Sequence, residues 1–144
     1  MYLERVRAHR GELGEAMRAL DDALALPVGL GALWRRRVRA ALTELEHDLR
    51  DHVDLTEQPG GLYADLQSRD ARLAVGLAAQ LEDHQHFLVE VTRLLDERDE
   101  GLVDDAVDLH REAATRLVGR LIRHRQRGAD LIYQAYAVDI GGSG

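Results

Sequence analysis

Residues 38–57 read VRAALTELEHDLRDHVDLTE, and the spacing of their apolar side chains predicts the fold. Positions that alternate in steps of four and three lie on one face of an α-helix. In this stretch that face carries, in order, Val38, Leu42, Leu45, Leu49, His52 and Thr56. Charged residues occupy most of the intervening positions. The stretch is therefore typical of an amphipathic helix that packs its apolar side against other helices.

The same spacing recurs along most of the chain. Pro27 and the sequence Gln58-Pro59-Gly60-Gly61 interrupt it, and Ser68 or Asp70 is the expected N-cap of a later helix. Helices are expected over residues 2–26 and 32–57, from the N-cap at 68 or 70 to 97, and over 102–136, with a short turn at 62–67.

Signals for β-strands are weak, so the chain is predicted to be all-α. Four amphipathic helices joined by short links predict an up-down-up-down four-helix bundle. The bundle is expected to span residues 1–138, followed by an irregular tail at 139–144.

The composition excludes several kinds of chemistry. All 19 basic residues of the 144 are arginine, and the chain has no cysteine but seven histidines. Without cysteine there is no disulfide and no thiolate metal ligand, and without lysine there is no Schiff base. The net charge of −7 disfavours nucleic-acid binding, and the arginines of Trp34–Arg39 are assigned to a solvated helix face.

No signal peptide or membrane-spanning run is found, so the protein is expected to be cytoplasmic and free of membranes. No nucleophile or substrate pocket is indicated either. We therefore do not expect a conventional enzyme, although a metal-dependent peroxide or iron-oxidising activity is compatible with the sequence.

Five histidines fall on the apolar helix faces, and every helix contributes at least one: His9, His52, His84, His110 and His124. The other two, His47 and His86, are expected at the surface. Buried imidazoles need polar partners, and imidazoles from four helices can form a metal site inside a bundle. The alternative is that each histidine is satisfied separately in the core.

The inward histidines are expected at different heights along the bundle axis. His52 and His124 are expected at one level, and His9 and His84 at another, about 8–12 Å away. His110 precedes His124 by 14 residues, about 21 Å of helix, so these two cannot share a site. A site made of imidazoles suits zinc, copper or iron.

Carboxylates are needed to bridge two iron ions. Glu57 and Asp130 are the best candidates because both are expected just beyond the level of His52 and His124. Glu4 and Glu82 are weaker candidates, for which a solvated helix face is the better interpretation.

Three stretches resemble the hemerythrin-like (HHE cation-binding) domain proteins. Residues 52–62, HVDLTEQPGGL, are similar to the second-helix His-plus-Glu element of the family, and Leu81-Glu82-Asp83-His84 is similar to its third-helix motif. Residues 124–142 resemble its fourth-helix histidine and Asp-Ile-Gly-Gly ending. The likeness covers essentially the whole chain.

The resemblance implies a non-haem di-iron centre that binds or senses dioxygen, peroxide or redox state. Carried over residue by residue, the metal ligands would be His9, His52, Glu57, His84 and His124, with Asp130 as the nearest further carboxylate.

The chain also departs from the family pattern. His52 and Glu57 are five residues apart rather than four, and Leu88 stands where the third helix normally has a second histidine. A mononuclear site is one alternative. Another is a metal-free bundle that acts in protein interaction or regulation, with its inward histidines as a pH switch.

Overall fold

The computed structural model describes residues 2–97 and 104–142, and these residues contain no β-strand. The all-α prediction is confirmed. The elements in chain order are α1 (Tyr2–Ala25), η1 (Val28–Leu30), α2 (Ala32–Glu57), α3 (Leu62–Arg69), η2 (Ala71–Leu73), α4 (Ala74–Asp96) and α5 (Asp104–Gly142).

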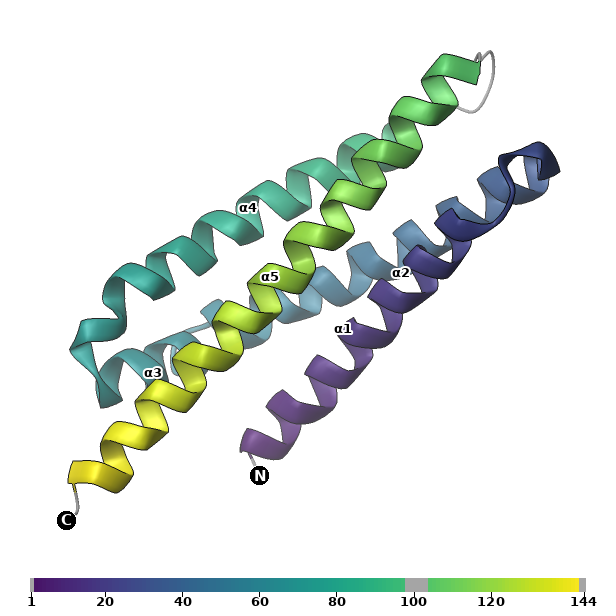
Figure 1. Ribbon diagram of the computed structural model, residues 1–144. Helices are drawn as coiled ribbons and strands as arrows, with labels where there is room; N and C mark the ends of the chain where they lie inside the picture. The colour runs from purple at the N-terminus through teal and green to yellow at the C-terminus, as the bar shows by residue number, and fades with distance from the viewer. Residues whose placement is uncertain (1, 98–103, 143–144) are drawn as a thin grey trace.

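The long helices α1, α2, α4 and α5 lie alongside one another (Figure 1). Helix α2 packs against α1 and α4, and α5 packs against α4 and α1. The short helix α3 lies at the end of the molecule that also holds both termini (Figure 1), where it contacts α2, α4 and α5. This arrangement is compatible with a helical bundle.

The break after α2 depends on glycine. Gly60 has a φ of +75°, a backbone conformation that glycine adopts without strain. At Gly61, a Cβ atom would lie 2.8 Å from the carbonyl oxygens of both Gln58 and Leu55. The chain can therefore turn this tightly only without a side chain at residue 61.

Three boundaries differ from the sequence prediction. The expected short turn at 62–67 is part of helix α3, which extends to Arg69. Asp70 does act as an N-cap, but for η2: its carboxylate accepts a hydrogen bond from the Arg72 backbone N–H, and α4 begins only at Ala74.

At the other end, α5 continues to Gly142, although an irregular tail was expected from residue 139. No proline interrupts this segment, so nothing forces the helix to end before the Gly141-Gly142 pair. Residues 143–144, and the expected helix start at 102–103, lie outside the described residues.

Two apolar clusters form the core. The larger one includes Leu13, Phe87 and Leu121 from α1, α4 and α5. The smaller one, at the α3 end, includes Val6, Leu77 and Leu131 from the same three helices, together with Leu62, Tyr63 and Leu66 of α3. Along α1, α4 and α5, a histidine stands between the members of the two clusters, so the imidazoles form a polar layer across the core.

Among the described residues, no helix combines the length and apolar character that crossing a membrane requires.

Candidate metal centre

The rings of His52, His84 and His124 converge at this polar layer. They come from α2, α4 and α5, and each offers a ring nitrogen within 4.8 Å of those of the other two. The ring centroids are 4.8 Å apart for His52 and His84 and 4.9 Å apart for His84 and His124. The Nε2 atoms of His52 and His124 are 3.2 Å apart. Three separate helices thus present imidazole nitrogens to one point.

Two carboxylates hold the outer nitrogens of this group. His84 Nδ1 lies 2.6 Å from Glu57 Oε2, and His124 Nδ1 lies 2.8 Å from Asp83 Oδ2. An ionised carboxylate only accepts hydrogen bonds, so each Nδ1 carries the proton and donates it. Each Nε2 then keeps its lone pair, which is the state that a metal ion requires.

A tyrosine from α3 completes the surroundings of His84. The Tyr63 hydroxyl lies 3.2 Å from His84 Nε2, and the two rings stack with centroids 5.6 Å apart. Burial raises the pKa of Tyr63, so its hydroxyl keeps the proton and can donate to Nε2. This hydrogen bond satisfies His84 Nε2.

Burial keeps the three imidazoles neutral. It lowers the pKa of His124 to about 4, against the opposite effect of Asp83. Burial also lowers the pKa of His84, although the hydrogen bond to Glu57 acts in the opposite direction. It lowers the pKa of His52 as well, and the positive charges that the neighbouring histidines would carry lower it further. Only 1% of His84 and of His124 is exposed, so charging either ring would be costly.

His9 of α1 extends the group but is not one of the three converging rings. It is 8% exposed and stacks on His52, with centroids 5.3 Å apart and planes inclined by 19°. Within the described part of the chain, the buried atoms His9 Nε2, His52 Nδ1 and Gln80 Oε1 have no hydrogen-bond partner. Unsatisfied polar atoms are rare in protein cores, and a bound water or ion is one of the ways in which such atoms are satisfied.

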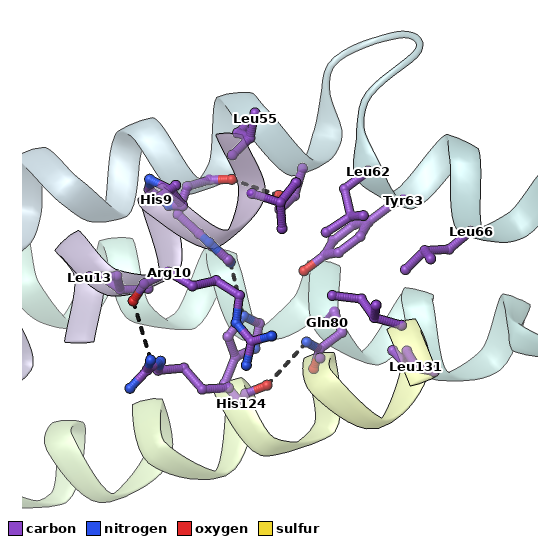
Figure 2. A pocket seen from close by; sticks show the side chains of 16 residues that line it. His9, Arg10, Leu13, Leu55, Leu62, Tyr63, Leu66, Gln80, His124 and Leu131 are labelled. Atoms are coloured by element: carbon purple, nitrogen blue, oxygen red, sulfur yellow. Dashed lines mark hydrogen bonds between the residues drawn. The ribbon is translucent and has the colours of Figure 1, made fainter. Parts of the chain in front are cut away.

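A cavity of about 30 Å³ adjoins the histidines and is shown in Figure 2. His9, His52 and His124 line one part of it, and Leu62, Leu66 and Leu131 line another. A space of this size holds one water or one diatomic molecule. The apolar lining favours an uncharged occupant.

The two carboxylates expected as ligands are placed differently. Glu57 reaches the site, but it bonds to His84 Nδ1 rather than joining the three converging nitrogens. Asp130 is exposed, and the structure does not bring it to the site. The weaker candidates Glu4 and Glu82 are also exposed, as expected.

The other histidines lie away from the centre. His47 and His86 are exposed, as expected. His110 is half-buried, and its Nδ1 lies 2.5 Å from Glu97 Oε2. On α2, His47 joins Asp48 and Asp51 in a second, exposed group that could hold a cation, although successive turns of an acidic helix commonly bring such side chains together.

The expected separation of about 8–12 Å between two histidine levels was wrong, because His84 and His9 both lie beside His52. That estimate measured each height from the connecting loop, with only a short turn expected between the second and third long helices. Helix α3 and η2 stand between α2 and α4 instead. The end of α2 and the start of α4 are therefore not equivalent reference points for height.

Two site residues were missed. Asp83 was passed over because it stands one position off the apolar face of its helix, although from there its carboxylate reaches His124 on α5. Its place beside His84 in the quoted Leu81–His84 motif was the available signal. Tyr63 lies in the segment expected to be a link, and nothing in its spacing marked it.

No protein-family model, curated protein or solved structure matches this chain.

Proposed function

We propose that this protein binds one transition-metal ion through His52, His84 and His124, and binds or senses a small molecule such as dioxygen or peroxide beside it. The observation that carries the proposal is the convergence of three imidazoles from three helices, two of them hydrogen-bonded to carboxylates. Carboxylates in this position orient metal-binding histidines and raise their basicity.

The donor set fits an ion of this class. Two nitrogens that each bind a tetrahedral ion at about 2.1 Å are about 3.4 Å apart, close to the 3.2 Å between His52 Nε2 and His124 Nε2. The rings are neutral at pH 7, as ligation requires, and three protein ligands leave a coordination position open. The adjoining cavity has room for a ligand at that position.

The resemblance to hemerythrin-like proteins favours iron as the metal. Glu57 and Asp83 hydrogen-bond to histidines instead of standing among the converging nitrogens, which supports one ion rather than a carboxylate-bridged pair. When bound, an iron ion with an open position supplies reversible binding of dioxygen or peroxide. The protein's own part is to exclude bulk water with its leucines and to hold the rings in place.

The same proposal includes an up-down-up-down order for the long helices. Packing of α1 on α2, α2 on α4, α4 on α5 and α5 on α1 supports it. So does Figure 1, in which α3 and both chain ends lie together.

The test is a metal analysis of the full chain produced with added iron. We expect about one iron per chain and an absorption spectrum that differs between argon and air. His124→Leu should lose the metal, whereas His86→Ala, which alters an exposed histidine outside the centre, should keep it. Colourless, iron-free protein, or equal iron content in both variants, would contradict the proposal.

A metal-free interaction module is the second candidate. It is favoured by the hydrogen bonds that already occupy the inner nitrogens, from His52 to His124 and from Tyr63 to His84. Thermal unfolding with and without a chelator separates the two candidates. A metal protein loses stability when stripped, and a metal-free module does not change.

A further inference from the structure

An open groove between α1 and α2 leads to the buried histidines from outside. Its volume is about 370 Å³, and Arg5, Glu12, Asp51 and Asp54 are among its lining residues. Three carboxylates and one guanidinium give it a net negative charge. Asp51 and Asp54 are exposed on α2, and Glu12 is exposed on α1, so these carboxylates are accessible to ions in solution.

His9 and Leu55 line the inner cavity, where Figure 2 labels them, and both also line this groove. They therefore form the wall between the two spaces. His9 stacks on His52, which also lines the inner cavity. His9 is more than nine-tenths buried, and its Nε2 has no partner among the described residues.

We propose that this groove is the entry route for a divalent cation, and that His9 passes the ion from Asp51 and Asp54 to His52, His84 and His124. The inference rests on the proposed metal site, but it concerns residues outside the three ligands. It assigns a role to His9, the buried histidine that is not one of the three proposed ligands.

The sizes of the two spaces support a stepwise transfer. An ion with six waters occupies about 180 Å³, which the groove accommodates and the inner cavity of about 30 Å³ does not. The ion must therefore lose water at the wall. Moving a bare ion into an apolar cavity is very costly, and a nitrogen ligand at the wall lowers this cost by replacing a lost water.

The experiment measures Co²⁺ uptake by stopped-flow absorbance in the full chain, together with Co²⁺ bound at equilibrium. For Asp51→Asn with Asp54→Asn, we expect about tenfold slower uptake at low ionic strength and less than a twofold difference at 0.5 M salt. The amount bound at equilibrium should stay at about one ion per chain. The matched control is Asp21→Asn with Asp22→Asn, exposed carboxylates about 18 Å or more along α1 from His9.

A second variant, His9→Phe, keeps a ring on His52 but removes the nitrogen. Co²⁺ uptake by this variant should be slower at every salt concentration, because the substitution removes a nitrogen ligand and does not change the charge of the groove. Normal uptake rates in both the aspartate pair and His9→Phe would overturn the entry route while leaving the metal site intact. Absence of bound Co²⁺ in the unaltered protein would overturn the metal site, and the route with it.

Discussion

The hydrogen bond from His124 Nδ1 to Asp83 gives the sharpest test of how the centre is built. The change Asp83→Asn keeps the size of the side chain and an acceptor oxygen but removes the negative charge. Asp83 is 26% exposed and lies 2.8 Å from Nδ1, so the existing bond is short and charge-assisted. Such bonds are about twice as strong as neutral ones.

The expected effect is on metal affinity. Loss of a carboxylate that orients a ligating histidine weakens metal binding by about 10- to 100-fold, which corresponds to about 1.4–2.7 kcal/mol. We expect the lower end of this range, because the asparagine oxygen can still accept a hydrogen bond from the Nδ1–H of His124. The nearby Arg127 contributes little, since its 3.7 Å pair with Asp83 is exposed.

The assay is competition for Zn²⁺ or Co²⁺ against a chromophoric chelator at pH 7. Asp130→Asn is the matched control, because Asp130 is exposed and does not belong to the group of converging histidines. It should bind metal within twofold of the unaltered protein. If Asp83→Asn also bound within twofold, or if Asp130→Asn showed the larger loss, the assignment of Asp83 as the group that orients His124 would be refuted.

Three further predictions follow from the structure. The metal-free protein should lose about 3 kcal/mol of unfolding free energy as the pH falls from 6.5 to 4. In this range the unfolded His124 takes up a proton, whereas the folded ring, with its pKa of about 4, largely does not. Urea unfolding measures this loss, and an unfolding free energy that does not change with pH would contradict the reasoning. Gly61→Ala should destabilise the fold by about 1–3 kcal/mol, since the new Cβ would meet two backbone oxygens at 2.8 Å. Gly11→Ala, with open space around it in α1, should stabilise the fold by up to about 1 kcal/mol. Chemical denaturation of both variants checks the sign of each effect. Metal at about 100 times its dissociation constant should add about 2.7 kcal/mol to stability, and an unchanged melting temperature would argue against binding to the folded state.

The helices and their inward faces were predictable from the sequence. The four-and-three spacing correctly separated buried His9, His84 and His124 from exposed His47 and His86, because it depends only on the geometry of a single helix. The breaks at Pro27 and Gly60-Gly61 were predictable for a similar local reason.

The relative heights of the helices were not predictable in the same way. They depend on how α3 fills the end of the molecule, which is a matter of packing between distant segments. The roles of Asp83 and Tyr63 depend on the same packing, since each acts on a histidine of another helix. Spacing along one helix carries no information on such contacts.

The origin of the three converging rings on α2, α4 and α5 has a mechanical consequence. An ion bound by all three would close one loop between residues 52 and 84 and another between residues 84 and 124. Cross-links of this kind stabilise a fold by reducing the freedom of the unfolded chain, as disulfides do. In a chain without cysteine, the ion would be a reversible cross-link that a chelator removes, and there is no disulfide for a reductant to cleave.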